Sequence, residues 1–110
     1  MIGLIVAVLV LMAGVAEAHT KATWNCNTEP DMKQYNVYAC LATGCTPGTF
    51  SKVATVPHTA GCTTSTWTLT PGTQGSLKVR AEDTAANESA DSNVATFDAN
   101  PPKAVTVTVE

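Results

Sequence analysis

Short runs of alternating apolar and polar residues, each closed by turn-forming residues, constrain the fold of this chain more than any other feature. The clearest run is Ser76 to Glu82, in which Leu77, Val79 and Ala81 alternate with charged residues. A period of two places the apolar residues on one face of a strand. No stretch shows the apolar spacing of an amphipathic helix. The pattern therefore predicts an all-β fold.

Seven such runs follow one another along the chain. Loops rich in Pro, Gly and Asn separate them at intervals typical of an antiparallel sandwich. Threonine, which favours extended backbone, occurs 18 times, always after the first 18 residues. The predicted strands cover residues 21–26, 34–40, 50–56, 65–70, 76–82, 92–98 and 104–110.

The first sixteen residues, MIGLIVAVLVLMAGVA, carry no charged side chain, and the following Glu17 and Ala18 complete an A-x-A cleavage pattern. We therefore expect residues 1–18 to be a signal peptide. The alternative is a retained hydrophobic helix, although about 16 residues span only about 24 Å of the ~30 Å membrane core. Cleavage after Ala18 would make His19 the first residue of a secreted, extracellular chain.

All the cysteines lie after this leader, at positions Cys26, Cys40, Cys45 and Cys62. An even number of cysteines in a small exported chain favours disulfides, and their spacing lacks the paired C-x-x-C pattern of zinc sites. The sequence therefore predicts an oxidising compartment, two disulfides, and no metal or other cofactor.

The charge of the chain excludes some classes of binding partner. It has 6 basic and 9 acidic side chains among 110 residues, for a formal net charge of −3. It thus lacks the basic stripe that nucleic-acid binding requires. Membrane contact is expected only if residues 1–18 are retained. No serine or cysteine nucleophile stands in a recognisable context, and a small sandwich offers no evident cleft for a carboxylate pair, so we expect no enzyme.

Three motifs in order resemble those of a fibronectin type III domain. Trp24 stands at the position of the family's second-strand tryptophan, and residues 29–38, EPDMKQYNVY, resemble its third strand. LTPGT at residues 69–73 and VRAEDTAANES at 79–89 are similar to its corner, sixth strand and following loop. The resemblance implies an immunoglobulin-like antiparallel β-sandwich over residues 19–98, with seven strands once a C-terminal strand, from the same chain or a neighbour, replaces the first.

The resemblance and the alternation together predict a core and a pattern of disulfides. Gly75 replaces the tyrosine whose hydroxyl closes the corner in the family, at a cost of about 1 kcal/mol. The second and fifth strands pair in this fold, so we expect a Cys26–Cys62 bridge beside a local Cys40–Cys45 bridge, with two other pairings left open. The predicted core consists of Trp24, Tyr35, Val37, Trp67, Leu69, Leu77 and Val79.

Four acidic residues, Glu82, Asp83, Glu88 and Asp91, cluster around the loop after the sixth strand. A calcium site would need several oxygens in a set register, and no EF-hand pattern is present. Because these residues match a turn motif of the family, we interpret them as structural.

The family's first strand has no counterpart in the mature chain, where only residues 19–23 precede the tryptophan. Residues 99–110 instead resemble a Pro-containing linker and a further strand, with Val105, Val107 and Val109 on one face. Folded back on its own domain, this strand would run parallel to the second strand, whereas on a neighbour it runs in the native antiparallel direction. We therefore predict donor-strand complementation, a head-to-tail contact that propagates into a filament. Self-complementation and an unpaired tail remain open.

The expected function is that of a non-enzymatic, secreted structural module that assembles with itself at the cell surface, as a filament or in adhesion. The alternative is a monomeric extracellular module that binds carbohydrate or a surface protein through its loops. A third possibility is copper binding through the amine and imidazole of His19, with His58 as the second ligand. An extended strand of up to ~23 Å separates these two histidines in the predicted fold, which weighs against that site.

Overall fold

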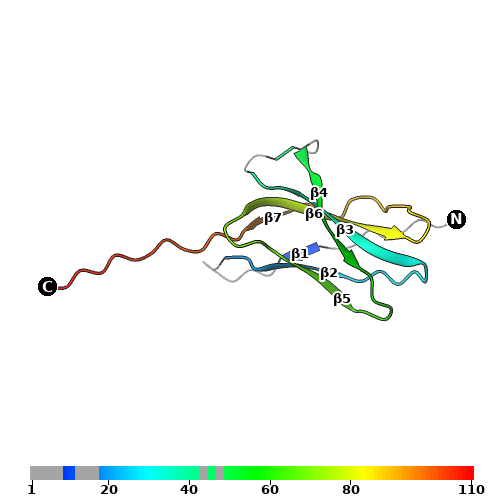
Figure 1. Ribbon diagram of the computed structural model, residues 1–110, viewed down its shortest axis with the longest axis horizontal. Helices are drawn as coiled ribbons and strands as arrows, with labels where there is room; N and C mark the ends of the chain where they lie inside the picture. Colours follow the sequence, from blue (N-terminus) through cyan, green and yellow to red (C-terminus); the bar gives the residue numbers. More distant parts are fainter. Residues whose placement is uncertain (1–8, 12–17, 43–44, 47–48) are drawn as a thin grey trace.

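The computed structural model describes residues 9–11, 18–42, 45–46 and 49–110. These residues contain no α-helix, and all paired strands are antiparallel (Figure 1). Within the same residues, no helix is long and apolar enough to cross a membrane. The strands are β1 (Leu9–Leu11), β2 (Lys21–Asn25), β3 (Met32–Cys40), β4 (Ser51–Pro57), β5 (Thr64–Thr68), β6 (Gln74–Asp83) and β7 (Ala95–Asp98).

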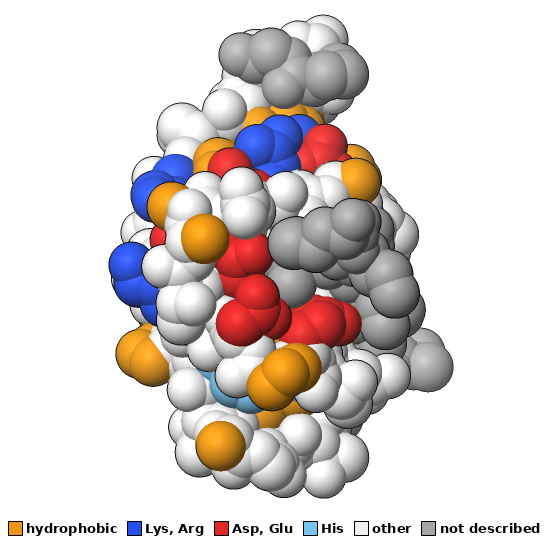
Figure 2. Space-filling view, turned by 90° about the vertical axis from the view of Figure 1, so that its right-hand side faces the viewer, with side chains coloured by type: hydrophobic (Ala, Val, Ile, Leu, Met, Phe, Trp, Pro, Cys, Tyr) orange, Lys and Arg blue, Asp and Glu red, His pale blue; other side chains and the backbone are white. Residues whose placement is uncertain are grey.

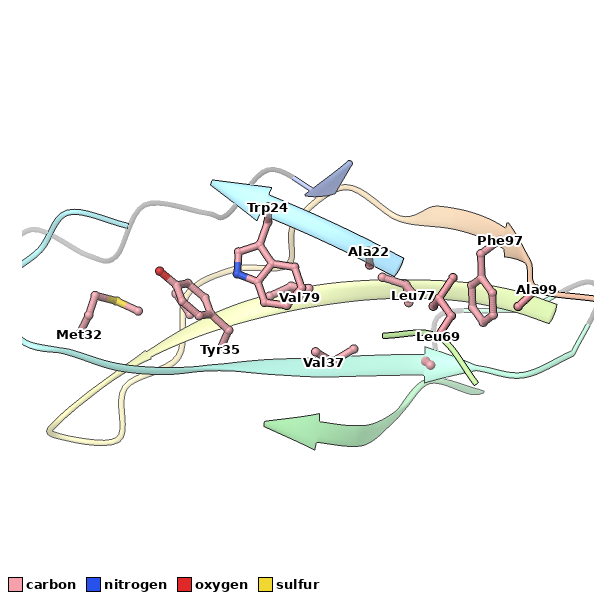
Figure 3. Packing of buried hydrophobic residues seen from close by; sticks show 12 residues of the cluster. Ala22, Trp24, Met32, Tyr35, Val37, Leu69, Leu77, Val79, Phe97 and Ala99 are labelled. Atoms are coloured by element: carbon pink, nitrogen blue, oxygen red, sulfur yellow. The ribbon is translucent and has the colours of Figure 1, made fainter. Parts of the chain in front are cut away.

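The strands form two sheets that pack face to face. One sheet has the order β1-β2-β5 and the other the order β4-β3-β6-β7. Buried side chains from both sheets fill the space between them, as in a β-sandwich (Figure 3). The predictions of an all-β fold and of antiparallel pairing are therefore confirmed.

Six of the seven predicted strands are present, with shifted ends. β3 begins two residues earlier than predicted, at Met32, and β7 begins three residues later, at Ala95. The predicted strand over residues 104–110 is not formed in this structure. A short strand inside the predicted leader, β1, instead pairs with β2. The remainder of the leader lies outside the described residues, so its role as a signal peptide stays a prediction.

The centre of the core is an aromatic pair contributed by the two sheets. The rings of Trp24 and Tyr35 meet edge to face, with centroids 5.6 Å apart. Burying each large side chain of this kind stabilises the fold by about 1.5–3 kcal/mol. Six of the seven predicted core residues are buried, whereas Trp67 is half-buried against the cluster. The core also contains Ala22, Met32, Ala39, Ala81, Phe97 and Ala99.

Two disulfides join the pairs of cysteines that were predicted. Cys26 at the end of β2 is bonded to Cys62 just before β5, and Cys40 at the end of β3 is bonded to Cys45. The first bridge therefore closes the end of the β2-β5 pair. Two disulfides indicate that the protein folds in an oxidising, extracellular environment.

Candidate interaction surface

Residues 101–110, which we call the tail, extend away from the sandwich (Figure 1). Every tail residue is exposed, and Val105, Val107 and Val109 are 85%, 79% and 90% exposed. Backbone hydrogen bonds fix the point of exit, because Ala99 N donates to Thr73 O and Ala99 O accepts from Gly72 N. The tail thus presents three valines, spaced for one face of a strand, to solvent.

The second feature is the edge of β2 that faces β1, which we call the acceptor edge. β1 covers it over three residues, with Leu9 opposite Trp24 and Leu11 opposite Ala22. Ala22 and Trp24 are buried in the core, whereas the intervening Thr23 is half-buried. A strand on this edge therefore needs apolar residues at alternate positions, opposite Ala22 and Trp24.

The start of β2 lies beside the exit of the tail. His19 N donates to Asp98 O at 2.8 Å, and Asp98 N donates to His19 Nδ1 at 2.9 Å. Because β2 runs away from this point, a tail folded back along its own acceptor edge would run parallel to β2. Both His19 atoms that would chelate copper already contact the Asp98 backbone. His58 lies beyond the other end of β2, so the structure does not bring the two histidines together.

An apolar pocket of about 420 Å³ opens at this tail end of the sandwich. It adjoins the start of β2 and the base of the tail. Its walls are formed by Ala18, His19, Thr20, Thr68, Leu69, Pro71, Ala99 and Pro101.

The opposite end holds a second, more polar pocket of about 430 Å³. Asn27, Glu29, His58 and Cys62 contribute to its lining. Glu29 Oε2 accepts from Asn27 Nδ2 at 3.2 Å, while its buried Oε1 has no hydrogen-bond partner among the described residues. Acidic side chains gather at this end of the molecule beside a histidine (Figure 2). A buried carboxylate oxygen at the end opposite the tail therefore lacks the hydrogen-bond donor that buried polar atoms usually have.

Tyr35 links this pocket to the core. Its hydroxyl accepts from the buried Asn27 N at 2.7 Å and lies 3.0 Å from His58 Nδ1. Burial raises the pKa of Tyr35 above 10.0, although the Asn27 hydrogen bond opposes that shift. Cys26, His58 and Cys62 hold their ligand atoms within 4.8 Å of one another, but both sulfurs are bonded in the disulfide. These contacts stabilise the end of the sandwich.

The acidic residues at the end of β6 and in the loop after it also have structural partners. Asp83 accepts from the backbone of Ala85 and Asn87 at 2.9 and 2.8 Å, which closes the turn, and the Asn87 hydrogen bond keeps the pKa of Asp83 below 3.8. Glu88 accepts from Asn36 and Tyr38, both at 2.7 Å. This loop therefore covers the outer face of the four-stranded sheet.

Asp91 completes the cover by pairing with two cations of β6. It accepts from Arg80 Nε at 2.6 Å and from Lys78 Nζ at 2.9 Å. The Arg80 hydrogen bond, followed by that of Lys78, holds the pKa of Asp91 below 3.8. Lys78 was predicted to face outward and is nevertheless 93% buried, because Asp91 and the Phe50 ring, 4.8 Å away, cover it.

The comparison with known proteins gives a structural likeness and no family. No family model matches the chain, and no curated protein matches it. The fold is similar to part of a β-1,2-glucanase from Parabacteroides distasonis, with a TM-score of 0.61 and 26% sequence identity. The aligned region covers 92% of this chain and 13% of the glucanase chain. This chain thus spans a small part of that protein's length.

Two parts of the surface were not found from the sequence. The pairing of β1 with β2 was missed because the apolar leader was interpreted only as a signal peptide or a helix. The polar pocket was missed because Glu29 and His58 are distant in sequence and meet only through the loops before β3 and after β4. Leu9–Leu11 lies in a continuous apolar run without alternation, so no period of two indicated a strand there.

Proposed function

We propose that this chain is a non-enzymatic, extracellular structural module of the fibronectin type III class, which assembles head to tail by donating its tail to a neighbouring copy. The observation that carries the proposal is the tail itself. Its three valines are at least 79% exposed, more than any other exposed large hydrophobic residue in the described part of the chain, where the next is Leu41 at 57%. Burying such a segment against a partner is favoured by roughly 1.5–3 kcal/mol for each valine.

The acceptor edge offers the complementary surface. Buried positions alternate along β2 as Ala22 and Trp24, and the valines alternate along the tail with the same period. In the antiparallel direction, backbone hydrogen bonds would join the two strands while valines complete the core. Because donor and acceptor lie on different surfaces, each copy both gives and receives a strand, and a filament results.

The proposal is tested with two aspartate variants of the mature, exported chain. Val107→Asp places a charge where the tail would enter the core, whereas Thr106→Asp places the same charge on the outer face. We expect sedimentation and negative-stain microscopy to show filaments for the parent chain and for Thr106→Asp, but monomers for Val107→Asp. Equal assembly of both variants, or a monomeric parent chain, would contradict the proposal.

A second candidate is a module that binds carbohydrate. The likeness to part of a β-1,2-glucanase favours it, because that protein is named for its action on a β-1,2-glucan and 92% of this chain aligns with part of it. In that case a β-1,2-glucan would bind through loops of the sandwich, and deletion of residues 101–110 would leave binding unchanged. Calorimetric titration of the parent and deleted chains with the glucan separates this function from assembly.

A further inference from the structure

The strand that covers the acceptor edge comes from the predicted leader. β1 spans Leu9–Leu11 and pairs with β2 in the antiparallel direction. The A-x-A pattern ends at Ala18, just before His19, whose backbone and side chain are fixed to Asp98. Cleavage there would remove β1 while leaving β2, its anchor on β7 and both disulfides in place.

We infer that β1 holds the acceptor edge closed, and that the tail of a second copy docks there in the register of β1 once the leader is removed. This inference rests on the proposed function and specifies its docking surface. In this register Val105 replaces Leu9 opposite Trp24, and Val107 replaces Leu11 opposite Ala22. β1 and the donated strand therefore compete for the same edge of β2.

Extending this register toward the start of β2 in the acceptor copy also gives the third valine of the donated tail a position. Val109 falls opposite Thr20, which lines the apolar pocket together with Leu69 and Ala99. Thr20 has the same parity as Ala22 and Trp24, so Val109 lies on the same face of the donated strand as Val105 and Val107. The pocket thus receives the last valine of the tail.

Extending the register in the other direction, beyond Trp24, brings Lys103 of the donated tail toward Glu29 of the acceptor copy. Lys103 falls opposite Cys26, at the end where Glu29 lines the polar pocket. Glu29 Oε1 is buried there without a hydrogen-bond partner among the described residues. A lysine arriving from a second copy supplies a partner of opposite charge. If the tail folded back in parallel on its own chain, Lys103 would instead lie near His19 at the start of β2, far from Glu29.

The test uses the full chain with a site-specific protease site inserted between Ala18 and His19, and with Val107→Asp in its own tail to prevent self-assembly. The probe is a fluorescent peptide of residues 100–110, measured by anisotropy before cutting and after gel filtration of the cut chain. We expect the peptide to bind at least tenfold more tightly after the leader is removed. A Val107→Asp peptide is expected not to bind, and a Thr106→Asp peptide to bind as the parent does.

The outcomes separate this inference from the proposed function. Equal binding before and after cutting would overturn the role of β1 and leave assembly through the tail standing. No binding at either stage would overturn both. If the cut chain loses its fold, recovery of its near-ultraviolet circular dichroism on adding the peptide becomes the readout, and no recovery overturns the inference.

Charge exchange tests the register and direction. Lys103→Glu in the peptide or Glu29→Lys in the cut chain is expected to weaken binding by about fivefold, and combining them to restore it. Asp31→Lys, a change of the same charge nearby in the sequence, serves as the control for non-specific attraction. Failure of the combined change to restore binding, or restoration by Asp31→Lys, would overturn the register.

Discussion

Gly75 shows how strongly a single residue can be fixed by its surroundings. It has φ +153°, and a Cβ atom there would lie 2.0 Å from Cys40 O. The backbone of β3 thus occupies the space that a side chain would need. This is the position where the fibronectin type III resemblance implies a corner tyrosine, so the local packing has no room for that ring.

Gly75→Ala is expected to destabilise the fold by more than about 2 kcal/mol, because β3 and β6 must separate to admit the methyl group. Urea unfolding followed by tryptophan fluorescence measures the change. Gly72→Ala is the matched control, since Gly72 has φ +86° but open space around it, and its cost should be limited to about 1–2 kcal/mol of backbone strain. A smaller loss at Gly75 than at Gly72 would contradict the packing described.

Tyr35→Phe is expected to cost about 1–3 kcal/mol, because the buried Asn27 N–H loses its acceptor while the ring packing remains. Tyr38→Phe removes a hydroxyl that donates to Glu88 at an exposed site, so it should cost less than about 1 kcal/mol. Thermal unfolding of the two variants compares these losses. Equal destabilisation would show that the Tyr35 hydroxyl has no special role.

At the scale of elements, the loop that covers the four-stranded sheet makes stability depend on pH. Burial raises the pKa of Glu88, but hydrogen bonds from Tyr38 and Asn36 outweigh burial and bring this pKa below 4.5. The pKa of Asp91 likewise lies below its ordinary value of 3.8. Groups with a lowered folded-state pKa stabilise fully above their ordinary values. That stabilisation is lost as pH falls through the folded-state pKa.

The urea midpoint is therefore expected to stay level from pH 7 to about pH 5 and to fall below pH 4. Asp91→Asn should lower the midpoint at pH 7, because Lys78 loses its partner, and should make the acid-induced fall smaller. Asp31→Asn, on an exposed carboxylate, is the control. A midpoint that is the same at pH 6 and pH 3 would contradict this account of the loop.

The two disulfides are expected to contribute unequally. On the chain-entropy account, closing the loop between Cys26 and Cys62 stabilises by about 4 kcal/mol, and closing the short loop between Cys40 and Cys45 by about 2 kcal/mol. Replacing each pair by serine and measuring urea unfolding tests the ratio. A larger loss for the short loop would show that the entropy of the unfolded chain does not govern the difference.

The sequence predicted those elements whose signals are local. Alternation predicted six strands, because one face of each strand packs toward the core, and the turn residues between them predicted where they end to within a few residues. Lys78 was harder to predict, since its burial depends on Asp91 and Phe50 from other elements. The strand β1 and the polar pocket depend on contacts between distant segments, and no local pattern encodes those contacts.

For the whole molecule, the central feature is the relation between the exposed tail and the acceptor edge that β1 covers. Apolar residues alternate with the same period on both, but within one chain the tail can reach this edge only in the parallel direction. Self-complementation would need a parallel pair along β2, whereas donation to a second copy preserves the antiparallel arrangement of the other strands. In the docking that we propose, β1 and the donated tail occupy the same edge of β2, so assembly requires removal of β1. A retained leader should therefore give monomers, and a cleaved one filaments.

The most direct measurement of this account is the mass and size of the exported protein in one sample. Intact mass spectrometry with and without reductant defines the first residue and the disulfides, while sedimentation and electron microscopy define the assembly. We expect filaments whose subunit begins at His19 and gains four hydrogens on reduction of its two disulfides. A monodisperse monomer beginning at His19 would contradict assembly through the tail, and filaments that retain Met1 would contradict the closing role of β1.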